Sequence, residues 1–81
     1  MTNSANPNAA ILRQTGVKVR LVGEDGNAFA ILGRVRAALR RAGESPEFIA
    51  AFTKEATSGD YTHLLATVLS VVEEAGDSEE D

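Results

Sequence analysis

The side chains that could perform catalysis in this chain of 81 residues are few and scattered. His63 is the only histidine and cysteine is absent, so the nitrogen and sulfur ligands of a zinc site are missing. Carboxylates stand in pairs at Glu24-Asp25 and Glu73-Glu74, but neighbours in sequence rarely converge on one substrate, and no serine or threonine has a base at a known spacing. We therefore predict no enzymatic activity, no cofactor and no metal site.

The loop GEDGN, from Gly23 to Asn27, precedes a predicted helix, where backbone N–H groups can bind an anion. However, it lacks the glycine spacings of dinucleotide and Walker motifs, and Glu24 and Asp25 would repel a phosphate. We expect Gly26 to serve in a turn and Asp25 or Asn27 to cap the helix. A small anionic ligand or a nucleotide is the alternative that this loop leaves open.

The stretch from Val17 to Val22 has the period of two expected of a strand with one buried face. Lys18 and Arg20 alternate with apolar residues and would point outward. A lone strand leaves unpaired backbone groups on both edges. We therefore predict that it pairs with the same strand of a second copy in a homodimer. Pairing with residues 9–14, which could form a second strand or a helical turn, is the alternative.

Three amphipathic helices are predicted after the strand, because apolar residues recur at the spacing of a helix with one buried stripe. In the third helix this stripe begins at Tyr61. A strand over residues 68–72 also fits the valines at the end of the third helix. The residues expected to begin and end the helices are Asn27 and Gly43, Ser45 with Pro46 and Ser58-Gly59, and Asp60 and Gly76. The residues expected to meet in one core are Leu32, Val35, Phe52, Leu65 and Val68.

This order of elements predicts the α+β class: a single small domain with one N-terminal β-strand followed by three α-helices (βααα). We place the globular domain at residues 13–76, with a flexible N-terminal tail at 1–12 and an acidic C-terminal tail at 77–81. Because the chain has no cysteine and no long apolar run, we expect no disulfide, no membrane span and a cytoplasmic location.

Two residues of the first helix lie off its apolar stripe. At about 100° per residue, Phe29 and Gly33 project to another side, one turn apart and beside Arg36 and Arg40. One interpretation is that the third helix or the strand covers Phe29 within the chain. The other is that these four residues form a surface that binds a partner.

The charge is unevenly distributed along the chain. Residues 13–41 contain seven basic side chains against two acidic ones, whereas residues 73–81 contain six acidic side chains and no basic one. A basic body with an acidic tail suits an anionic partner with which the tail competes. Alternatively, the tail keeps a small protein in solution.

Two stretches, GEDGNAFAILGRVRAALRRAG (Gly23 to Gly43) and SGDYTHLL (Ser58 to Leu65), resemble a pattern in uncharacterised small proteins of bacteria and their phages and plasmids. The resemblance implies a strand followed by a helix, and a mobile-element setting. It carries no activity and no functional residues. By analogy, such a setting favours a small regulator or an inhibitor of a host or defence protein.

The order of elements also resembles that of a ribbon-helix-helix repressor, in which strands pair across a dimer and outward side chains read the major groove of DNA. That resemblance would give Lys18 and Arg20 a DNA-binding role. Glu44 and Glu47 depart from the pattern, because they stand where a phosphate would bind. We therefore favour a non-enzymatic module that binds another protein, with a DNA-binding regulator as the alternative.

Overall fold

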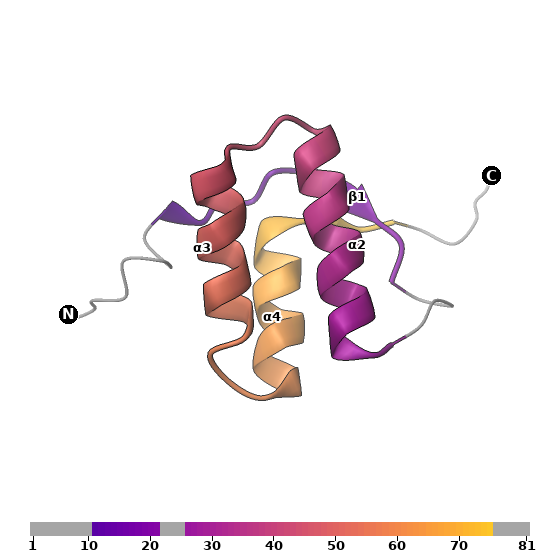
Figure 1. Ribbon diagram of the computed structural model, residues 1–81. Coiled ribbons are helices and arrows are strands. Elements are labelled where there is room, and N and C mark those ends of the chain that lie inside the picture. Colours follow the sequence, from indigo (N-terminus) through magenta and orange to yellow (C-terminus); the bar gives the residue numbers. More distant parts are fainter. Residues whose placement is uncertain (1–10, 22–25, 76–81) are drawn as a thin grey trace.

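The computed structural model describes residues 11–21 and 26–75. Within them the chain forms a small, mostly helical domain of three helices and two short parallel strands (Figure 1). Each helix contacts the other two, and α2 and α3 run antiparallel (Figure 1). None of the helices in the described ranges is long and apolar enough to cross a membrane. In chain order the elements are β1 (Lys18–Val19), α2 (Ala28–Arg41), α3 (Pro46–Ala56), α4 (Tyr61–Val71) and β2 (Glu73–Glu74).

The helices begin where the sequence predicts. Asn27 accepts a hydrogen bond from the backbone N–H of Phe29 at 2.8 Å. Ser45 and Asp60 accept equivalent bonds three residues ahead, at 3.1 and 2.9 Å. These bonds satisfy N–H groups that have no partner inside the helix. Asp25, the other predicted cap of α2, lies outside the described residues.

Gly43 ends α2 as predicted, with a φ of +88°. Its N–H donates to the carbonyl of Arg40, and the N–H of Glu44 donates to that of Leu39, each at 3.0 Å. This pair of bonds is the Schellman arrangement, which needs a left-handed residue and therefore favours glycine. The tight turn to Ser45 folds α3 back beside α2 (Figure 1).

The strand prediction is correct in position and incomplete in topology. Of the described residues of the predicted strand, 17–21, only Lys18 and Val19 form a strand, with Val19 buried and Lys18 exposed. They pair in parallel with Glu73 and Glu74, so a second strand that the sequence analysis did not predict covers one edge of β1. Of residues 11–14, the described part of the alternative partner segment, none lies in a strand.

The third helix ends before Gly76, contrary to the prediction. Val72 is already extended, with a φ of −127° and a ψ of 167°. The N–H groups of Glu73 and Ala75 then donate to the carbonyls of Val17 and Val19, each at 2.8 Å. The backbone of residues 73–75 therefore bonds to β1 instead of continuing the helix. Because β1 is distant in sequence, local patterns did not predict this end of α4.

The segment before β1 covers the C-terminal end of α4. Thr15 donates to the carbonyl of Val71 from its backbone N–H at 2.7 Å and from its hydroxyl at 2.8 Å. Gln14 donates from its side chain to the carbonyls of Leu69 and Val72, at 3.1 and 3.4 Å. These donors satisfy carbonyl groups that the end of a helix leaves without partners, and α4 has no basic residue in its last turn.

The core forms where the three helices meet, and four of the five predicted residues are buried in it. Val35, Phe52 and Val68 are fully buried, and Leu32 is 7% exposed. Leu65 is only partly buried, at the edge of the core. The buried arc of α4 contains Leu64, Thr67, Val68 and Val71 instead. Because α4 is apolar around much of its circumference, its sequence did not specify which side faces inward.

Candidate functional site

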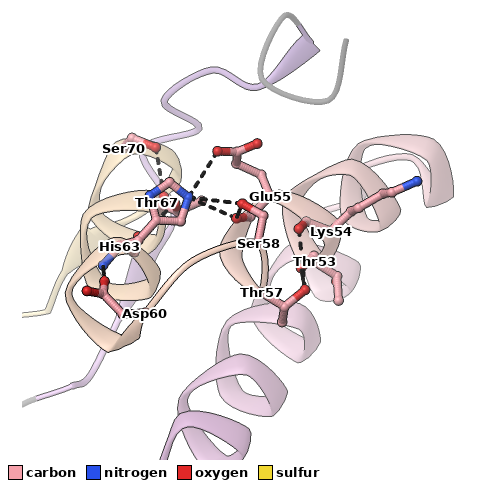
Figure 2. Close-up of polar contacts among 9 residues, drawn as sticks. All are labelled: Thr53, Lys54, Glu55, Thr57, Ser58, Asp60, His63, Thr67 and Ser70. Atoms are coloured by element: carbon pink, nitrogen blue, oxygen red, sulfur yellow. Dashed lines mark hydrogen bonds and ion pairs between the residues drawn. The ribbon is translucent and has the colours of Figure 1, made fainter. Parts of the chain in front are cut away.

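A group of polar contacts surrounds His63 at the junction of α3 and α4 (Figure 2). Its Nε2 atom lies 3.0 Å from the Glu55 carboxylate, 3.0 Å from the Glu55 carbonyl and 3.3 Å from the Ser58 hydroxyl. The Ser58 hydroxyl in turn donates to the Glu55 carbonyl at 2.7 Å. Serine, histidine and glutamate therefore meet here, as they do in hydrolases, although the sequence spacing did not suggest it.

The geometry of this cluster differs from that of a nucleophilic triad. In a nucleophilic triad the serine contacts one ring nitrogen and the carboxylate orients the other. Here Ser58 and Glu55 contact the same ring nitrogen, Nε2. Because the backbone carbonyl and the carboxylate of Glu55 are both acceptors, we assign the ring hydrogen to Nε2. A protonated Nε2 cannot act as a base toward the Ser58 hydroxyl. The cluster instead ties the end of α3 to the first turn of α4.

Gly59, Asp60 and Tyr61 of the SGDYTH stretch are also constrained by neighbours within the chain. A Cβ atom at Gly59 would lie 2.9 Å from the Cβ of His63, so only glycine fits there without a shift. Asp60 caps α4, and the Tyr61 hydroxyl donates to the Gly26 carbonyl at 2.6 Å. The structure therefore accounts for this motif as a helix junction.

Gly26 and Asn27, the described residues of the loop before α2, also have contacts within the chain. Asn27 caps the helix, and the carbonyl of Gly26 accepts the bond from Tyr61. Asp25 lies outside the described residues. The Gly26 carbonyl and the Asn27 side chain are therefore both bonded within the chain, and these contacts give an anion-binding loop no support.

The outer face of α2 is different, because no hydrogen bond or ion pair joins the side chains of its four residues to another residue in the described part of the chain. We call Phe29, Gly33, Arg36 and Arg40 the α2 face. Phe29 is 84% exposed, so neither α4 nor the strand covers it. A Cβ atom at Gly33 would meet no atom within 4 Å. Arg36 and Arg40 are exposed and form no ion pair with any other residue in the described part of the chain.

An apolar hollow of about 240 Å³ lies at the Phe29 end of this face. Leu32 and Leu64 contribute apolar surface from α2 and α4, and Ala56 and Thr57 contribute from the end of α3. Tyr61, which the sequence analysis placed on the buried stripe of α4, lines this hollow and is 47% exposed. Two exposed aromatic rings, those of Phe29 and Tyr61, therefore border the apolar hollow.

A second hollow, of about 390 Å³, lies at the other end of the face. Arg36 and Arg40 line it together with Ile49 and Ala50 of α3. Glu44 also lines it, but its carboxylate accepts a bond from Arg13 at 2.6 Å. The acidic group of this hollow is therefore already paired, while the two α2 arginines are not paired with it.

The predicted DNA-binding residues lie apart from this face, on β1. Lys18 forms an ion pair with Glu73 at 2.7 Å across the strand pair. Arg20 is exposed and also has an interaction within the chain. The carboxylates of Glu73 and Glu74 lie beside the strand that would have to approach DNA phosphates. In addition, β1 pairs in parallel within its own chain, unlike the strands that pair across a ribbon-helix-helix dimer.

No group of three or more histidine, cysteine, aspartate or glutamate side chains that could hold a metal ion occurs in the described ranges. Comparison of the chain with protein-family models, curated proteins and solved structures found no match. The α2 face and the two hollows that border it are therefore the features of this structure that bear on function.

Proposed function

We propose that this protein is a non-enzymatic module that binds another protein through the α2 face. One observation carries the proposal: Phe29 is 84% exposed beside an apolar hollow. Aromatic and arginine side chains supply a large share of binding energy at protein interfaces, and the α2 face combines Phe29 with Arg36 and Arg40. An exposed aromatic residue of this size has no role in the folding core, which leaves binding as its use.

The biological setting that we propose is that of a small regulator or an inhibitor of a host or defence protein, acting in the cytoplasm. It rests on the resemblance of the GEDGNAF and SGDY stretches to small proteins of phages and plasmids. A binding face without a catalytic group suits an inhibitor, which acts by occupying a surface.

The proposal is tested by capturing partners from bacterial lysate on the immobilised full chain and on two variants. Phe29→Ala removes the exposed ring, and Leu69→Ala is the matched control, because Leu69 is an exposed apolar residue (48%) outside both hollows. We expect a protein retained by the wild type and by Leu69→Ala to be lost from Phe29→Ala. Identical retention by all three chains would contradict the proposal.

A homodimer through β1 is a second part of the proposal. Within the described residues the sheet has two strands, so the outer edge of β1 has no strand beside it. Such an edge can accept the strand of another copy. Because β2 already occupies one edge, the fold does not depend on the dimer. Sedimentation at tens of micromolar is the test: a dimer that dissociates when a proline replaces Lys18 is expected, and a monomer would contradict this part.

A further inference from the structure

The two hollows lie toward opposite ends of the pair formed by α2 and α3. The apolar hollow is lined by the start of α2 and the end of α3, and the basic hollow by the end of α2 and the start of α3. Because α2 and α3 run antiparallel and side by side (Figure 1), both hollows lie along the same two helices. We call the surface between the two hollows, from Phe29 to Arg40 on α2 and the facing side of α3, the groove. At about 1.5 Å per residue, Arg36 lies about 10 Å and Arg40 about 16 Å along the axis from Phe29.

The middle of the groove permits a close approach. Gly33 lies between Phe29 and Arg36 on the α2 wall, and the space beyond its Cα is open. On the α3 wall, the hydroxyls of Thr53 and Thr57 donate to carbonyls of their own helix, each at 2.8 Å. Neither hydroxyl therefore needs a partner from outside, and the wall can contact apolar atoms.

The charges of the groove are complementary to an acidic segment. Arg36 and Arg40 line the basic hollow, and the carboxylate of Glu44 is held by Arg13. Arg13 is itself fixed, because its guanidinium lies 4.9 Å from the centre of the Phe48 ring. A partner that places carboxylates near Arg36 and Arg40 would gain charge-assisted hydrogen bonds that no described residue of this chain supplies.

The form of the partner follows from the walls. Both walls are helices, whose backbone groups bond within the helix, so an extended segment would find no N–H or C=O groups to pair with. A helix satisfies its own backbone and can lay apolar side chains into such a groove.

We infer that the groove binds an amphipathic helix with an acidic end: an apolar side chain enters the hollow beside Phe29, and carboxylates meet Arg36 and Arg40. The inference rests on the proposed function and names the class of partner. The contact needs about three turns, with carboxylates about seven and about eleven positions from the apolar anchor.

The test is a selection of random peptides of about 16 residues, displayed on phage, against the full chain. We expect the enriched peptides to combine an apolar anchor with aspartate or glutamate about seven and about eleven positions away. A synthetic copy of the best peptide should lose at least about tenfold in affinity when its acidic residues become lysine or when a proline interrupts its centre.

Variants of the protein locate the bound peptide. Phe29→Ala and the double variant Arg36→Glu, Arg40→Glu should each weaken binding at least about tenfold, and Leu69→Ala should not change it. Gly33→Ala should weaken it as well, because a methyl group would fill the open space.

Three results would overturn the inference. If the selected peptides depend on Phe29 but tolerate lysine or central proline, the partner class is wrong and the proposed binding face stands. If their binding is indifferent to Phe29, Arg36 and Arg40, the proposed function fails too. If the wild type sediments as a dimer that Phe29→Ala dissociates, the occupant of the groove is a second copy of this chain.

Discussion

Two regions of the molecule carry distinctive sequence, and the fold uses only one of them. At the junction of α3 and α4, Ser58, Gly59, Asp60 and His63 each have a contact or a steric requirement within the chain. On the α2 face, Phe29 is 84% exposed and Gly33 faces open space. The residues at the junction therefore have a structural role, and the α2 face is the surface to which we assign the proposed binding.

The comparison also shows how a catalytic appearance can mislead. The junction has the residue types of a hydrolase, yet Ser58 and Glu55 contact the same nitrogen of His63. The α2 face has an aromatic ring and two arginines, which are side-chain types that often supply binding energy at protein interfaces. Residues that have no role in folding are therefore better evidence of function here than a familiar set of residue types.

The largest expected effect contrasts two phenylalanines. Phe52 is fully buried and Phe29 is 84% exposed. We expect Phe52→Ala to lower the free energy of unfolding by about 3 to 5 kcal/mol, because it leaves a cavity among the three helices. Phe29→Ala should change it by less than about 0.5 kcal/mol.

Urea denaturation followed by circular dichroism measures both variants, and a Phe52→Ala chain that is already unfolded in buffer agrees with the prediction. A Phe29→Ala variant as unstable as Phe52→Ala would mean that the α2 face belongs to the core.

The next effect contrasts two glycines. Gly59→Ala forces a methyl group against the His63 ring, and we expect a loss of about 1 to 3 kcal/mol. Gly33→Ala adds a methyl group in open space within a helix, so it should stabilise the protein by about 0.5 to 1 kcal/mol. In thermal melts the two variants should therefore shift the midpoint in opposite directions, by about 4 to 8 °C per kcal/mol for a domain of this size. Equal shifts would remove the distinction between the two regions.

A smaller effect is expected at the cap of α4. Asp60 accepts the bond from the N–H of His63, and Asp60→Ala should cost about 1 kcal/mol. Asp60→Asn keeps an acceptor at the same position and is the matched control. Chemical denaturation of both should give a loss for alanine and little change for asparagine. A loss of equal size in both would show that the carboxylate charge, rather than the cap, stabilises the junction.

The smallest effect concerns the charges of the α2 face. Arg36→Ala combined with Arg40→Ala should leave the free energy of unfolding, measured by chemical denaturation, within about 0.5 kcal/mol of the wild-type value. The reason is that neither guanidinium pairs with another described residue. Lys18→Ala is the comparison, since Lys18 has an ion pair with Glu73, although exposed pairs contribute at most about 1 kcal/mol. A double variant less stable than Lys18→Ala would give Arg36 and Arg40 a structural role.

Duplex DNA tests the alternative function on the same variants. Retention of DNA that falls steeply between about 50 and about 200 mM salt, and that is lost in Lys18→Ala, Arg20→Ala, would favour a DNA-binding regulator. We expect no such retention, because Glu73 pairs with Lys18 and adds its negative charge beside the strand.

The features that the sequence predicted well depend on neighbours in the chain. Asn27, Ser45 and Asp60 cap helices that start within one residue of them, and Gly43 ends α2 by bonds that span five residues. Residues 29, 33, 36 and 40 share one side of α2 by helical geometry alone. Local geometry was therefore sufficient for the starts of the three helices, for the end of α2 and for the grouping of the α2 face.

The features that the sequence did not predict depend on partners far along the chain. Glu73 and Glu74 look like part of a solvated acidic end, and only their pairing with β1 makes them a strand. Tyr61 was assigned to the buried stripe of α4 but borders the apolar hollow, since the packing of α4 on α2 decides which side faces inward. Whether Phe29 is covered depends on the same packing, which is why both interpretations remained open before the structure.

The most direct test of the central claim is the affinity of Phe29→Ala, relative to the wild type, for the acidic helical peptide selected against the full chain. Isothermal titration calorimetry on both proteins gives this ratio, and their thermal melts establish that both are equally folded. We expect at least about a tenfold loss of affinity with an unchanged melt. Two results would contradict the claim that Phe29 binds a partner and does not stabilise the fold. One is an equal affinity of both proteins for the peptide, and the other is a loss of affinity together with a lower melting midpoint of Phe29→Ala.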